Sequence, residues 1–113
     1  MHEMKELSKK NPDHISKKRY LELKNFCLQY SEWLRELPYD VTGLYKSKIE
    51  LVDSAIVQLE EYIRPYIFEA VTTGKSYEVL NAYYQVPCCK QNYYAYYRKF
   101  FSYLSHSQEL RGV

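Results

Sequence analysis

Apolar residues recur every three or four positions through two long stretches of this chain. In the first stretch the recurring positions are Tyr20, Leu23, Cys27, Tyr30, Leu34 and Leu37. Alternating spacings of three and four place side chains on one face of an α-helix. We therefore expect one helix over 17–37, opened by an N-cap at Ser16 and widened on its apolar face by Phe26 and Trp33.

The second stretch repeats this pattern after a turn at Pro38. Its apolar positions are Tyr45, Ile49, Val52, Ile56, Leu59 and Ile63. Asp40 or Thr42 can cap this helix, which we expect over 41–63. Two amphipathic helices joined by so short a connection fold back on each other. The sequence therefore predicts a long antiparallel helical hairpin over 16–63.

Shorter elements follow the second stretch. Pro65 is tolerated in a first helical turn, so we expect it to open a short helix that ends at Gly74. Ser76 is then a natural N-cap for a helix over 77–84.

The turn over 85–89 separates that helix from a final helix, which we expect from about Lys90 to Ser105. A short helix, a tight turn and a longer helix form the layout of a helix-turn-helix unit. The sequence thus predicts an all-α single domain with a helix-turn-helix-like unit over 64–106 and a flexible tail over 1–15.

Composition adds an unusual aromatic content to an otherwise ordinary soluble chain. Among 113 residues there are 14 Tyr and only 3 Gly. The net charge of +2 is small, but its distribution is uneven, because no acid lies between Val86 and His106. The first 19 residues lack the apolar segment of a signal peptide, and no apolar run is long enough to span a membrane. We therefore expect no signal peptide, no membrane partner and a cytoplasmic location.

Catalysis and metal binding find no support in the sequence. It contains no Gly-rich phosphate loop and no Ser, His and Asp set, so we expect neither an enzyme nor a cofactor. The three cysteines, Cys27, Cys88 and Cys89, lack the paired spacing of a zinc site, so no metal is expected. A thiol at a helix N-terminus has a depressed pKa, which predicts that Cys88 or Cys89 alkylates readily.

A family resemblance appears in the C-terminal third. Ser76-Tyr77-Glu78, followed by Leu80, Tyr84, Val86 and Pro87, resembles the first helix and turn of the sigma-70 region 4 helix-turn-helix. The final helix, with Tyr93, Tyr94, Tyr96, Tyr97, Arg98 and Lys99, looks like the variant in small phage-encoded regulators of late-gene transcription, the ArpU and RinA type. The segment 23–30, with Trp33 after it, is similar to phage or prophage proteins of Firmicutes.

The resemblance covers about 30 residues and includes three departures from the motif. Asn81 stands where the motif has a small residue, and Gln85 stands where it has Gly. The loop over 86–93 is also a residue or two longer. Since a left-handed backbone is easiest for Gly, these departures bear on how the last helix is presented.

As the resemblance implies, we expect transcriptional regulation through duplex DNA, with RNA polymerase as a further partner. Lys90, Gln91 and Asn92 would lie in the first turn of the final helix, the part that reaches base edges. An amide pairs bidentately with adenine, and a lysine reaches guanine or a phosphate. Arg98 and Lys99 would hold phosphates.

The aromatic residues of the final helix leave alternatives open. One stripe, expected to be buried, comprises Tyr93, Tyr97, Phe100 and Leu104. The remaining aromatics fall on other faces and are candidates for a partner interface: Tyr94, Tyr96, Phe101 and Tyr103. Tyr96 also suits a DNA-backbone surface.

The partner at such an interface can be a second copy of the chain, giving a homodimer, or another host protein. In the latter case the chain would be a protein-binding module, such as a phage-encoded inhibitor or adaptor of a host complex. A virion assembly protein is a third interpretation.

Overall fold

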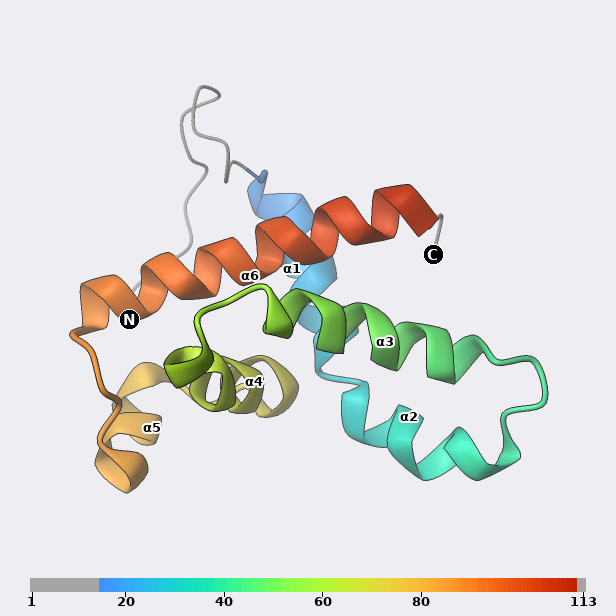
Figure 1. The fold of residues 1–113 in the computed structure, drawn as a ribbon, viewed down its shortest axis with the longest axis horizontal. Helices are drawn as coiled ribbons and strands as arrows, with labels where there is room; N and C mark the ends of the chain where they lie inside the picture. The colour runs from blue at the N-terminus through green and yellow to red at the C-terminus, as the bar shows by residue number, and fades with distance from the viewer. Residues whose placement is uncertain (1–14, 112–113) are drawn as a thin grey trace.

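The computed structural model describes residues 15–111, and every regular element in that range is helical (Figure 1). The α-helices are α1 (Lys17–Cys27), α2 (Tyr30–Glu36), α3 (Leu44–Val57), α4 (Arg64–Thr73), α5 (Tyr77–Tyr84) and α6 (Lys90–Arg111). Two 3-10 turns, η1 (Leu37–Tyr39) and η2 (Glu61–Ile63), precede α3 and α4. The predicted all-α class is confirmed. None of the helices described is long and apolar enough to cross a membrane.

The tail predicted over 1–15 lies outside the described residues except for Ile15. That side chain is 8% exposed and belongs to the core. Helix α1 begins two residues later, where the Ser16 hydroxyl accepts a hydrogen bond from the Arg19 N–H at 3.1 Å. The predicted N-cap is therefore confirmed, and Ile15 is part of the core rather than of a flexible tail.

The prediction of one continuous helix over 17–37 is wrong. The N–H of Leu28 still bonds to the carbonyl four residues back, but the N–H of Gln29 bonds to Phe26, three residues back, at 3.2 Å. This tighter turn ends α1 and changes the direction of the chain before α2. Leu34 and Leu37 are consequently 48% and 38% exposed, because the redirected helix buries other positions.

The predicted long hairpin is also not formed. Helix α2 packs against α3, but α1 packs against α6 and α4 instead of continuing along α3. Helix α3 ends at Val57 rather than at Ile63, and the chain turns before η2. Leu59 and Ile63 are nevertheless buried. The prediction that they are buried is therefore correct, whereas the prediction that they belong to the second helix is wrong.

The start of α3 follows the prediction only in part, because the N-cap position is Gly43, with φ 77° and no side-chain cap, while Asp40 and Thr42 bond to the first turn from farther upstream. The Thr42 hydroxyl accepts a hydrogen bond from the Leu44 N–H at 3.2 Å, and the Asp40 carboxylate accepts one from the Lys46 N–H at 3.0 Å. Between them these side chains satisfy two backbone donors that the first turn of a helix leaves unpaired.

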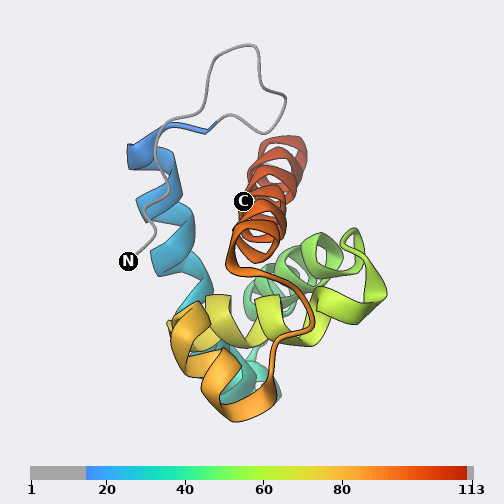
Figure 2. The same cartoon turned by 90° about the vertical axis from the view of Figure 1, so that its left-hand side faces the viewer.

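Helix α6 is the central element of the fold. It packs against α1, α3 and α4, with α1 and α3 on opposite sides of it and α4 beneath it in the view of Figure 2. Phe100, Phe101 and Leu104 are fully buried along it. It runs six residues beyond the predicted end at Ser105. Within this part of the helix the Arg19 guanidinium donates hydrogen bonds to Ser105 at 3.0 Å and Gln108 at 2.9 Å.

Candidate nucleic-acid interface and tyrosine pocket

Helix α5 has the length and the cap that the sequence predicted. The Ser76 hydroxyl accepts a hydrogen bond from the Val79 N–H at 3.3 Å. Its C-cap is Gln85, with φ 55° and ψ 73°, the one non-glycine residue with positive φ among those described. Gln85 therefore adopts the left-handed conformation for which the resembling motif uses Gly, at a cost of about 1–2 kcal/mol.

The turn between α5 and α6 is fixed at both ends. Val86 is buried, and the Tyr77 hydroxyl donates a hydrogen bond to the Cys88 carbonyl at 3.1 Å. The Cys89 carbonyl accepts from the Tyr93 N–H at 2.9 Å and so begins the α6 ladder. The turn is thus held at its start and at its end, while α6 beyond it packs against α3, α1 and α4.

The three candidate base-contacting residues in the first turn of α6 differ in solvent exposure and in ion pairing. Gln91 and Asn92 are exposed. Lys90 is half-exposed and forms an ion pair with the Glu78 carboxylate in the first turn of α5. This pair raises the pKa of Lys90 and lowers the pKa of Glu78.

The two candidate phosphate-contacting residues lie two turns later. Lys99 is exposed, whereas Arg98 is half-buried beside a pocket described below. Tyr96, the remaining candidate, has its hydroxyl 2.8 Å from the Tyr62 hydroxyl. Hydrogen bonds to Tyr62 and Glu60 raise the pKa of Tyr96, so this side chain is tied to the η2 segment.

Two of the four residues expected at a partner interface belong to the core instead. Tyr94 is 7% exposed and Phe101 is fully buried. The Phe101 ring lies 5.0 Å from that of Tyr97 and 5.2 Å from that of Tyr20 on α1. Tyr103 is half-buried.

The expectation failed because α1 crosses α6 rather than extending a hairpin. Helices on both sides then cover faces of α6 that a hairpin would have left open. The predicted stripe is largely correct: Tyr93, Phe100 and Leu104 are buried, and Tyr97 is half-buried.

Large apolar side chains are exposed elsewhere, around the connection between α2 and α3. They are Leu34, Leu37, Tyr39, Val41 and Leu44. Val41 is 99% exposed and Tyr39 is 79% exposed. The apolar spacing predicted that Leu34 and Leu37 would be buried, so this exposed apolar surface could not be predicted from periodicity alone.

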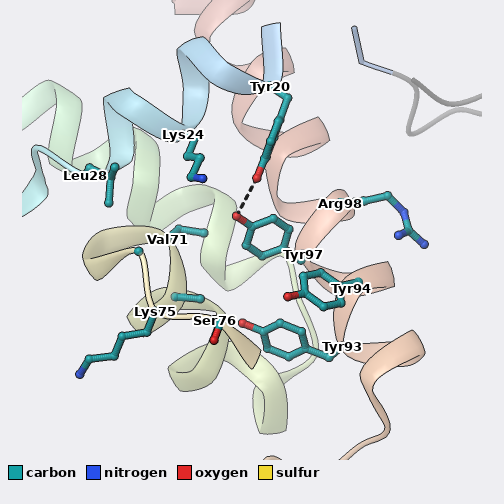
Figure 3. Close-up of a pocket in the computed structure, with 12 residues that line it drawn as sticks. Tyr20, Lys24, Leu28, Val71, Lys75, Ser76, Tyr93, Tyr94, Tyr97 and Arg98 are labelled. Atoms are coloured by element: carbon teal, nitrogen blue, oxygen red, sulfur yellow. Dashed lines mark hydrogen bonds between the residues drawn. The ribbon is translucent and has the colours of Figure 1, made fainter. Parts of the chain in front are cut away.

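A small pocket lies between α1, the α4–α5 turn and α6 (Figure 3). Its volume is about 60 Å³. The side chains of four tyrosines on α1 and α6 form much of its wall: Tyr20, Tyr93, Tyr94 and Tyr97. The basic residues that line it are Lys24, Lys75 and Arg98, and none of the described residues in its wall is acidic.

The hydroxyls in this pocket are unequally satisfied. Those of Tyr20 and Tyr97 lie 3.1 Å apart and share a hydrogen bond. The Tyr93 hydroxyl is buried and has no hydrogen-bond partner in the described part of the chain. Leaving a buried hydroxyl unsatisfied costs about 1–3 kcal/mol. Burial also raises the pKa of Tyr93 and of Tyr97.

The prediction of a depressed thiol pKa in the turn before α6 does not hold for Cys88. Cys88 is half-buried, and this desolvation raises the pKa of its thiol, so the predicted depression is wrong there. Cys89 is exposed, and burial raises the pKa of Cys27 to about 12. Within residues 15–111 no group of His, Cys, Asp and Glu is arranged to hold a metal ion.

Comparison of the chain with family models, curated proteins and solved structures found no match. We therefore infer its function from the geometry described above.

Proposed function

We propose that this chain is a non-enzymatic transcriptional regulator of the phage or mobile-element type, which reads duplex DNA with the first turns of α6. The observation that supports it most is the exposure of Gln91 and Asn92 at the start of a long helix. That helix follows a capped short helix and a fixed turn. In such units α6 would enter the major groove while α5 lies across the backbone.

The exposed amides supply the base contacts in this proposal. The carbonyl oxygen of an Asn or Gln side chain accepts from adenine N6, and its NH₂ donates to adenine N7. Each such bidentate pair discriminates against a wrong base by about 1–3 kcal/mol. Gln91 and Asn92 are adjacent, so they project in different directions and would contact different base pairs.

The charges on α6 supply the backbone contacts. Lys90, Arg98 and Lys99 precede the first acid of the helix, Glu109. The Glu78 carboxylate lies against Lys90 and opposes the approach of phosphates. With a net charge of +2 for the whole chain, we expect weak non-specific binding that is sensitive to salt.

Fluorescence anisotropy of a labelled random duplex over a salt series tests this proposal. We expect the Lys90→Ala/Lys99→Ala variant to bind more weakly. The slope of log K against log salt should fall by about 0.9 for each phosphate that the variant no longer neutralises. Arg98 is left intact in this variant because it lines the tyrosine pocket.

A matched control is Arg35→Ala/Lys46→Ala, which removes two exposed positive charges from α2 and α3. It should leave the slope unchanged. Equal weakening of binding in both variants would mean that net charge, and not α6, attracts the DNA. Absence of binding at the lowest salt would reject an autonomous DNA-binding function.

A second candidate function is a protein-binding module, an inhibitor or adaptor of a host complex such as RNA polymerase. The exposure of Tyr39 and Val41 favours it, since aromatic and aliphatic anchors dominate protein interfaces. Surface plasmon resonance with purified bacterial RNA polymerase tests it. The Tyr39→Ser/Val41→Ser variant should lose binding, whereas Lys90→Ala/Lys99→Ala should retain it.

A further inference from the structure

We propose that the tyrosine pocket between α1, the α4–α5 turn and α6 binds a small oxyanion of the size of phosphate. Such a site would not depend on DNA binding. Three features support it: the volume of the cavity, the donors that line it and one buried hydroxyl without a partner among the described residues.

The volume suits a phosphate group. A cavity of about 60 Å³ has room for roughly four to six water molecules. That matches the few oxygen atoms of a tetrahedral oxyanion. Leu28, Gly74 and Lys75 are exposed, so the side of the pocket at the α4–α5 turn adjoins solvent.

The unpartnered donor is the Tyr93 hydroxyl. Tyr93 is 1% exposed, and its hydroxyl points from α6 toward Ser76 at the start of α5 (Figure 3). Buried polar groups in folded proteins nearly always have a hydrogen-bond partner. An oxyanion oxygen that displaced the atoms now covering this hydroxyl would accept its hydrogen bond.

Further donors face the same space. The Ser76 oxygen accepts from a backbone N–H, which leaves its own proton to donate. In the pair formed by Tyr20 and Tyr97, one hydroxyl donates to the other, so one proton remains for a third acceptor. The pocket therefore presents mainly donors, which select an acceptor-rich ligand.

Three basic residues line the pocket, of which Arg98 directs its guanidinium away from the tyrosine hydroxyls (Figure 3). The ammonium group of Lys24 is directed from α1 into the space above Tyr97 (Figure 3). Lys75 contributes less, because it pairs with Glu69 at 2.6 Å and points away from the tyrosines. Since none of the described residues in the wall carries a carboxylate, Lys24 and the neutral donors together favour a monoanion or dianion.

The test is a titration with sodium phosphate against sodium chloride at equal ionic strength, followed by ¹⁵N chemical shifts and thermal unfolding. We expect saturable shifts at Ser76 and Tyr93 and a rise in Tm with phosphate alone. Tyr93→Phe and Lys24→Gln should each weaken phosphate binding several-fold. Lys46→Gln, an exposed lysine on α3, should not.

Tyr93→Phe separates a binding role from a structural one. If the pocket were only an imperfection of packing, this variant would be at least as stable and would respond to phosphate like the parent chain. That response, or equal effects of phosphate and chloride on the parent chain, would overturn the proposal.

A parallel titration with glycerol 3-phosphate shows which source the site accepts. Tighter binding than inorganic phosphate would indicate a phosphorylated metabolite, and weaker binding would indicate the free ion. Adding duplex DNA to the phosphate-saturated protein keeps the two proposals apart. Release of phosphate would assign the pocket to a DNA phosphate and reject the free-ion site.

Discussion

The carboxylate of Glu78 in the first turn of α5 forms an ion pair with the ammonium group of Lys90 in the first turn of α6. The contact joins the two helices of the proposed DNA-binding unit near their N-termini. Both side chains are about half exposed, at 54% and 43%, so solvent screens the pair and its contribution to stability is small.

Replacing this acid tests its effect on DNA. Glu78→Gln keeps the shape of the side chain and removes a negative charge beside Lys90. We expect tighter binding to a random duplex at low salt and an unchanged Tm. The exchange Glu109→Gln, at the far end of α6, removes the same charge and should have a smaller effect. Equal gains from both would refute a local role for Glu78.

The amides at the start of α6 predict a change in specificity. We expect Asn92→Ala to reduce discrimination at one base pair by about 1–3 kcal/mol, with little change in the salt dependence of binding. Selection from a random duplex library, carried out with both proteins, measures this. An unchanged consensus would show that Asn92 does not contact a base.

The bond between Tyr30 and Asp53 predicts a loss of stability. The Tyr30 hydroxyl donates to the Asp53 carboxylate at 2.8 Å and joins α2 to α3. Tyr30→Phe should lower the free energy of unfolding by about 1 kcal/mol, because a partly buried hydrogen bond is removed while the ring remains. Tyr39→Phe, on a side chain that is 79% exposed, is the control in urea unfolding and should have no effect.

The thiols predict an order of reactivity. With its pKa at about 12, Cys27 should resist iodoacetamide in the folded protein, while exposed Cys89 reacts. Mass spectrometry of the alkylated chain checks this. Rapid labelling of Cys27 under native conditions would contradict its burial.

The raised pKa of Cys27 also makes the free energy of unfolding depend on pH in the alkaline range. The folded pKa of Cys27 lies above its ordinary value of 9.0, so the folded state holds this proton more tightly than the unfolded state does. Its contribution to stability is complete below pH 9.0 and is lost as the pH rises toward about 12. Cys27→Ala should therefore show a shallower loss of stability than the parent chain over that window, as measured by urea unfolding at several pH values.

Some elements followed from local chemistry and were predictable. Ser16 and Ser76 cap helices, and Gly74 takes the left-handed position that ends α4, because these features depend on a few neighbouring residues. The apolar stripe of α3 marked Ile49 and Val52 as buried for the same reason.

Other elements depend on packing between distant segments. The break at Leu28 and Gln29 contains neither Gly nor Pro, and the apolar spacing continues through it. Its cause is tertiary: α1 packs against α6 while α2 packs against α3, so the two helices must diverge. The burial of Phe101 follows from that crossing and has no signal in local sequence.

Some features of the candidate site could likewise be predicted from local sequence, whereas others depend on the tertiary structure. Exposure of Gln91 and Asn92 was predictable from a polar helix start. The pairing of Lys90 with Glu78, twelve residues away, needed the turn geometry. The tyrosine pocket needed three separate segments to meet, so no spacing in the sequence indicated it.

The most direct test of DNA reading by α6 is a ¹⁵N NMR titration of the protein with a short duplex at low salt. We predict that the largest backbone shifts fall at Gln91, Asn92 and Lys99, with small shifts around Val41 in the α2–α3 connection. Shifts concentrated around Val41, or no shifts at all, would contradict the reading of DNA by this helix.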